Sequence, residues 1–167
     1  AGRIGDTIVQ ESAAHQGAEP PEVVIVGFGP AGQIAARDLV DRSIRVTVLE
    51  LNQAGVQKAK QLGFHAEVGD ATQTEVLEHA RVAESQVVVI TIPHHKSALA
   101  VLSHIRSHAP QVHTIVRARY AVFQDDFVIA GADKISGDEQ QVGENLAVHL
   151  KQWLGSGGKS QPSSRED

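Results

Sequence analysis

Short runs of apolar residues recur along the chain and alternate with segments in which apolar residues are spaced three or four positions apart. Four runs are almost continuously apolar and rich in Val and Ile, which is typical of parallel strands covered on both faces. These runs are Glu22–Val26, Ile44–Glu50, Gln86–Ile92 and Val112–Val116. Two shorter strands are expected at His65–Val68 and Lys134–Ile135.

Helical spacing fills the intervals between these runs and continues after the last of them. The expected helices are Ala31–Asp41, Gln53–Leu62, one from Thr72, His95–Ser107, Tyr120–Ile129 and one containing Val142, Leu146, Leu150 and Trp153. Thr72-Gln73-Thr74-Glu75 matches a capping box, so Thr72 is expected to cap the third helix. The apolar stripe of the last helix is typical of a core face, and docking on a partner subunit is the alternative.

The regular alternation of strands and helices predicts an α/β fold of one domain. We expect a Rossmann-type, doubly wound parallel sheet with strand order 3-2-1-4-5-6. Residues 1–21 end in Glu19-Pro20-Pro21 and are interpreted as a linker. Residues 155–167 are rich in Gly and Ser and are expected to be a disordered tail. The nucleotide-binding domain is therefore expected over residues 22–154.

The sequence Gly27-Phe28-Gly29-Pro30-Ala31-Gly32 matches the G-x-G-x-x-G pattern of a dinucleotide-binding loop. The pattern alone is weak, but here it follows a predicted strand and opens a predicted helix. Gly27 is expected to form the tight turn, Gly29 to let a pyrophosphate approach the backbone, and Gly32 to let the helix pack closely. A glycine-rich turn that binds nothing is the alternative interpretation.

Glu50 ends the second predicted strand, 18 positions after Gly32, where this fingerprint has an acid. Its carboxylate can accept hydrogen bonds from ribose hydroxyls and would repel a 2′-phosphate. The arrangement therefore favours AMP or NAD(H) over NADP(H).

Polar residues also follow the other predicted strands, where the ligands of open α/β sheets bind. Asp70 is expected either to accept a hydrogen bond from the adenine amino group or to form a turn beside Thr72. Thr91 is expected to face a phosphate or the ribose, whereas His94 is interpreted as an ordinary loop residue. Arg117 and Arg119 suit an anionic ligand, and salt bridges to Asp125 or Asp126 are the alternative.

Composition excludes several classes of function. The chain contains no cysteine, so disulfides, zinc–thiolate sites and cysteine-based redox sensing are ruled out. The net charge of −5, with no basic block, argues against nucleic acid as a partner. His104 and His108 are four positions apart on one helix and lack an evident third metal ligand, so a solvated face is preferred.

A catalytic constellation is not evident in the sequence. There is no convincing Tyr/Lys pair, His/Asp pair or nucleophile with a base, and Tyr120 is the only tyrosine. We therefore expect a protein that is not an enzyme. An NAD-dependent oxidoreductase cofactor domain is the alternative.

Several runs together resemble the RCK (regulator of potassium conductance) N-terminal domain, the Trk/Ktr/Kef-type nucleotide-binding domain. The similar runs are VVIVGFGPAGQIAARDL, VTVLELN, GFHAEVGDAT, VVVITIPHH, IVRARY and GADKI. The chain looks most like the version at the cytoplasmic C-terminus of monovalent cation:proton antiporters. Pro30 stands where the glutathione-gated members often have Arg, so triphosphate binding and glutathione gating are not expected.

The resemblance implies a regulatory domain that binds AMP or NAD(H), forms a homodimer and gates potassium or sodium transport. It implies a transmembrane antiporter domain in the same chain and a location at the cytoplasmic face of the inner membrane. Combined with the motif analysis, it predicts contacts to the nucleotide from Gly27, Phe28, Gly29, Pro30, Ala31, Gly32, Glu50, Leu51, Asp70, Ala71, Thr72, Thr91, Ile92 and Arg117.

Overall fold

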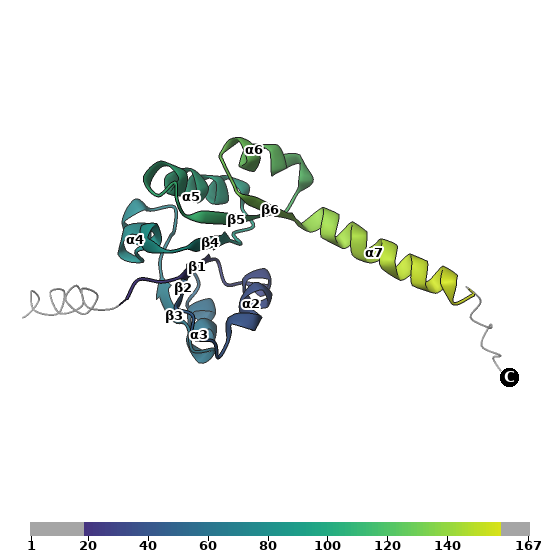
Figure 1. The fold of residues 1–167 in the computed structure, drawn as a ribbon, viewed down its shortest axis with the longest axis horizontal. Coiled ribbons are helices and arrows are strands. Elements are labelled where there is room, and N and C mark those ends of the chain that lie inside the picture. Colours follow the sequence, from purple (N-terminus) through teal and green to yellow (C-terminus); the bar gives the residue numbers. More distant parts are fainter. Residues whose placement is uncertain (1–18, 158–167) are drawn as a thin grey trace, which may run out of the picture.

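A computed structural model describes residues 19–157 of the 167-residue chain. Six parallel strands form one sheet in the order β3-β2-β1-β4-β5-β6, which confirms the predicted doubly wound fold (Figure 1). The strands are β1 (Val23–Val26), β2 (Val46–Glu50), β3 (His65–Val68), β4 (Val87–Ile90), β5 (His113–Ala118) and β6 (Lys134–Gly137).

Helices lie between consecutive strands, as the alternation predicted. They are α2 (Pro30–Ala36), η1 (Arg37–Leu39), α3 (Gln53–Gln61), α4 (Thr74–His79), η2 (Val82–Glu84), α5 (His95–His108), η3 (Ala121–Phe123), α6 (Gln124–Ile129) and α7 (Asp138–Gly155). The first predicted helix is shorter than expected, because η1 follows α2 and Asp41 then adopts a left-handed conformation with φ of 60°.

The predicted capping box is wrong. The N-cap residue of α4 is Gln73, and its side chain makes no capping hydrogen bond. The Thr72 hydroxyl instead donates to Asp70 Oδ1 at 2.7 Å. The Thr72 hydroxyl, which was expected to cap the helix, is thus engaged in a local hydrogen bond with the Asp70 side chain.

Both faces of the sheet are covered, which explains the continuous apolar character of the strands. Along β1, Ile25 faces a core shared with α2 and α3, whereas Val24 and Val26 face a core shared with α4, α5 and α6. All three side chains are at most 1% exposed. The buried central strand therefore provides a rigid support for the glycine loop that follows it.

Helix α7 departs from this arrangement. It extends away from the sheet edge at β6 (Figure 1). None of its 18 residues is buried. The interpretation of its apolar stripe as core is wrong: Val142, Leu146, Leu150 and Trp153 are 57%, 63%, 60% and 53% exposed. The stripe meets no sheet face because the helix runs outward from the last strand.

The predicted terminal segments lie mostly outside the described residues. Of the linker, residues 19–21 are described, and Arg45 Nε donates to the Pro20 carbonyl at 2.7 Å. Of the predicted tail, Gly155 is the last residue of α7, and residues 158–167 lie outside the described part. Among the described residues, no helix is both long and apolar enough to span a membrane.

Candidate functional site

A cleft of about 340 Å³ opens at the carboxyl ends of β1, β2, β3, β4 and β5. This is the edge at which open α/β sheets bind ligands, and the volume is within the range of small-molecule sites. Every predicted nucleotide-binding residue except Phe28 lines it. Six further residues line it, which are Val26, Leu49, Gly69, Pro93, His94 and Ser97. Of these, the sequence singled out only His94, as an ordinary loop residue.

The three glycines of the loop have different structural roles. Gly27 has a φ of +93°, and a Cβ there would lie 2.7 Å from Thr91 Oγ1. A Cβ on Gly32 would collide with the Gly27 carbonyl oxygen. In contrast, a Cβ on Gly29 would meet no protein atom within 4 Å. The fold itself therefore requires Gly27 and Gly32, whereas Gly29 leaves free space in the cleft.

Thr91 supports this loop from the neighbouring strand. Its hydroxyl group donates to the Gly27 carbonyl at 2.7 Å and lies 3.2 Å from the Val26 carbonyl. The side chain is 6% exposed. The single hydroxyl proton is thus used within the protein, and Thr91 fixes the loop in addition to lining the cleft.

Glu50 is held by two backbone amides at the mouth of the cleft. Oε2 accepts a hydrogen bond of 2.6 Å from Phe28 N, and Oε1 accepts one of 2.9 Å from Asn52 N. A Cβ on Gly55 in α3 would lie 2.7 Å from Glu50 Cγ. The sequence analysis did not identify Gly55, although a glycine in the first turn of a helix is a signal of close packing.

Phe28 contributes its backbone to the site and its ring to the core. The ring is 1% exposed and packs edge-on against Phe64, with 6.3 Å between the ring centroids. The carbonyl of Phe28 accepts a hydrogen bond of 2.9 Å from Gln33 Nε2. The ring is therefore packed in the core, and the amide and carbonyl of Phe28 already have partners in Glu50 and Gln33.

The loop after β3 forms a compact turn around Asp70. Asp70 Oδ1 accepts hydrogen bonds from Thr72 N at 2.9 Å and from Thr72 Oγ1 at 2.7 Å. The Thr72 hydroxyl, followed by the Thr72 amide, holds the pKa of Asp70 below its usual value. Asp70 is therefore an ionised acceptor at the edge of the cleft, next to the buried Ala71. Leu51, 68% exposed, lies on the cleft rim.

Arg117 lines the cleft from β5 and forms a salt bridge, as in the alternative interpretation, but with another partner. Its Nε and Nη2 atoms bind both carboxylate oxygens of Asp138, at 3.0 Å for Nε and 2.6 Å for Nη2. This contact raises the pKa of Arg117. The alternative interpretation named Asp125 or Asp126 as the partner, but Arg117 pairs with Asp138, and Asp126 contacts His95 Nε2 at 2.9 Å.

Of the remaining candidates, Arg119, His104 and His108 lie outside the cleft, whereas His94 lines it. Arg119 lies over the ring of Tyr120, 5.4 Å from its centroid. His104 and His108 stack with 4.1 Å between their ring centroids, and burial followed by the nearby His108 lowers the pKa of His104. Within the described residues, no group of three or more potential metal ligands is found. His94, interpreted as an ordinary loop residue, is the N-cap of α5 and accepts from Ser97 N at 3.3 Å.

Residues 23–137 match the family model of the TrkA-N domain. The chain belongs to the TrkA-N family. This confirms the resemblance to the RCK N-terminal domain that the sequence motifs indicated. The match ends at Gly137, so α7 lies just beyond it.

Solved structures with the same fold include the TrkA-N domain of the Escherichia coli inner membrane protein ybaL, with a TM-score of 0.74 and 22% identity. The similarity covers 79% of this chain and 98% of that one. The Shewanella denitrificans Kef CTD in AMP-bound form has a TM-score of 0.71 and 24% identity over 80% of each chain. The GsuK channel bound to NAD has a TM-score of 0.63 and 21% identity, over 71% of this chain and 22% of the channel chain.

Proposed function

We propose that this chain is the regulatory, non-catalytic domain of a monovalent cation/proton antiporter, that it senses AMP or NAD(H), and that it acts as a homodimer at the cytoplasmic face of the membrane. The observation that supports it most strongly is the position of Glu50. Its carboxylate is bound to the amide of Phe28 inside the glycine loop, at the entrance of the cleft. An acid fixed beside a phosphate-binding loop suits an adenosine ribose.

The structural relatives support the same ligands. The similar Kef domain was solved with AMP and the similar GsuK channel with NAD. In this chain the phosphate would lie against Gly29, where no protein atom occupies the space of a side chain. The adenine would lie near Asp70, whose ionised carboxylate can accept a hydrogen bond from the amino group.

The dimer is proposed from α7. Most of the stability of a helix in a protein comes from the packing of its apolar face, and the apolar stripe of α7 is exposed. Two apolar residues near the same end of the sheet, Val122 of η3 and Ile129 of α6, are 79% and 85% exposed. A second copy of the chain would cover both surfaces, since a two-fold pair places each stripe against its mate.

Isothermal titration with AMP, NAD, NADH and NADPH tests the ligand proposal. We expect binding of AMP or NAD(H) and weak or no binding of NADPH. Glu50→Gln is expected to weaken the binding of AMP and NAD(H). It is also expected to narrow the difference in affinity between NADH and NADPH, because the charge that repels the 2′-phosphate is removed. Glu75→Gln, which removes an exposed charge on α4 outside the cleft, is the matched control.

Absence of binding by all four nucleotides would show that the proposal is wrong. If the unmodified chain bound NADPH as tightly as NADH, the proposed role of Glu50 in repelling the 2′-phosphate would be refuted. The regulatory part is tested in a full-length transporter that contains this domain, reconstituted in vesicles. Nucleotide addition is expected to change proton-coupled cation flux, and Glu50→Gln is expected to remove that response.

A further inference from the structure

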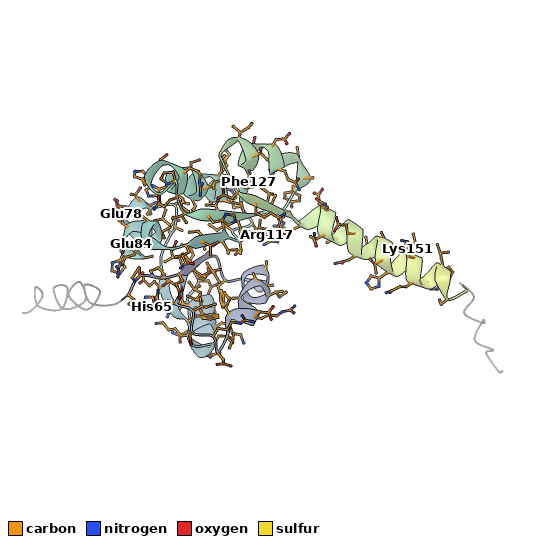
Figure 2. All side chains as sticks on the ribbon, viewed as in Figure 1. His65, Glu78, Glu84, Arg117, Phe127 and Lys151 are labelled. Carbon is orange, nitrogen blue, oxygen red and sulfur yellow. The ribbon has the colours of Figure 1, made fainter. Side chains whose placement is uncertain are left out.

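The ion pair between Arg117 and Asp138 connects the cleft to α7. Arg117, labelled in Figure 2, is on β5 and lines the cleft, whereas Asp138 is the first residue of α7. Both side chains are partly buried, at 26% and 32% exposure. The guanidinium group binds the carboxylate through Nε and Nη2 and directs Nη1 towards the Thr91 carbonyl, at 3.4 Å.

This geometry places a carboxylate of the protein on the cation that an anionic ligand would use. A planar guanidinium binds carboxylate and phosphate in the same two-pronged way, so the two compete for the same N–H groups. Asp138 also favours the start of α7, because a negative charge stabilises the N-terminus of a helix. The Gly137 N-cap supplies no side-chain hydrogen bond there.

Only part of a dinucleotide reaches this position. With its adenosine ribose at Glu50 on β2 and a phosphate at the loop after β1, a bound dinucleotide would continue towards β4 and β5, the next strands in the sheet. Arg117 is two strand spacings beyond β1, which is about 10 Å. A mononucleotide placed in this way would end at the glycine loop, whereas the second phosphate and nicotinamide ribose of a dinucleotide would extend towards Arg117.

We propose that Asp138 competes with the distal half of a dinucleotide for Arg117, so that NAD(H), but not AMP, loosens the start of α7. The inference rests on the proposed nucleotide function and adds how the site distinguishes two ligands and passes the difference to a helix. The coupling is reciprocal: if binding of a ligand weakens the Arg117–Asp138 contact, that contact lowers the affinity of the ligand by the same free energy.

The first test measures the affinities of NAD and AMP for the 167-residue chain by isothermal titration. Asp138→Asn removes the competing charge and keeps the size of the side chain. It is expected to raise NAD affinity by about fivefold, the factor expected for a partly exposed ion pair, and to leave AMP affinity unchanged. Asp138→Ser is expected to act in the same direction. Glu139→Gln removes a charge from the same helical turn outside the cleft and is the control, with no change for either ligand.

The second test measures amide hydrogen exchange in the first two turns of α7. NAD is expected to speed exchange there in the unmodified chain, and AMP is not. Asp138→Asn is expected to speed exchange without ligand and to abolish the effect of NAD. A purely structural ion pair would change stability and would leave the ratio of NAD to AMP affinity unaltered.

The outcomes separate the two proposals. If neither nucleotide binds the unmodified chain, the nucleotide function and the competition are both wrong. If both bind, and the Asp138 variants leave their affinity ratio equal to that of Glu139→Gln, only the competition is wrong. Slower exchange in α7 on NAD binding would also overturn it.

Discussion

The carboxylate of Glu50 accepts a 2.6 Å hydrogen bond from the backbone amide of Phe28, 22 positions earlier in the chain. The bond joins the end of β2 to the glycine loop after β1. It is possible because the two strands are parallel neighbours, with Val26 paired with Leu49. The acid predicted to bind a ribose therefore also holds the loop predicted to bind the phosphate.

Replacing Glu50 is consequently expected to affect stability as well as binding. In Glu50→Gln, one side-chain atom facing the backbone amides becomes a donor, so one hydrogen bond to the carboxylate is lost. The free energy of unfolding is expected to fall by about 1–3 kcal/mol. Urea denaturation followed by circular dichroism measures this, and Glu75→Gln is expected to change it by less than about 0.5 kcal/mol. Equal values for the two variants would contradict the role of the Phe28 contact.

The glycine loop allows stability and binding to be separated. Gly27→Ala places a side chain in a left-handed conformation against Thr91, and we expect a loss of about 1–3 kcal/mol in unfolding free energy. Gly29→Ala is expected to cost no more than about 1 kcal/mol, the N-cap preference, and to weaken AMP binding. Thermal unfolding and titration of both variants check this. The explanation fails if Gly29→Ala binds AMP like the unmodified chain.

The Thr91 hydroxyl is expected to support the fold as well as the loop. Thr91→Val keeps the shape of the side chain but removes the donor to the Gly27 carbonyl, which is expected to lower the unfolding free energy by about 1–3 kcal/mol. Thr91→Ser keeps the hydroxyl and is expected to lose less. Chemical denaturation ranks the two variants, and the reverse ranking would show that the methyl group matters more than the hydrogen bond.

The acid side of the stability profile is expected to depend on Asp133. The Thr114 amide, followed by the Thr114 hydroxyl, Arg106 and His113, holds the pKa of Asp133 below its usual value. Because the folded pKa is lower than the unfolded one, this stabilisation is present above the ordinary Asp pKa of about 3.9 and is lost as pH falls through the folded value. Melting temperatures between about pH 6 and pH 2 are expected to fall less steeply in Asp133→Asn. An unchanged slope would refute this contribution.

The exposed stripe of α7 is expected to determine the association state. The double variant Leu146→Glu/Leu150→Glu places two charges on the stripe and is expected to convert a dimer into a monomer in analytical ultracentrifugation. Val148 is 51% exposed and lies about 200° around the helix from each leucine, so Val148→Glu is the matched control and is expected to remain dimeric. A monomeric unmodified chain would show that the proposed dimer is wrong.

Much of the fold was predictable because the signals are local. Strands buried on both faces must be apolar throughout, so runs such as Gln86–Ile92 show in the sequence where β4 lies. Strand order follows from the handedness of short crossovers, which does not depend on individual side chains. Helix ends were less accurate, because Thr72 had two possible hydrogen-bonding partners and only the folded turn around Asp70 selects between them.

The sequence by itself determined the order of the elements, the glycine loop, and the acid at the end of β2. These follow from spacing along the chain and from backbone requirements that only certain residues meet. The tertiary structure decided which partner each side chain meets: Glu50 the Phe28 amide, Thr91 the Gly27 carbonyl, and Arg117 the carboxylate of Asp138. It also decided that α7 runs away from the sheet, so that none of its residues is buried by the rest of the described chain. Such pairings depend on strand order and register, since a charged side chain has several partners of suitable sign along the sequence and only the folded distances select one.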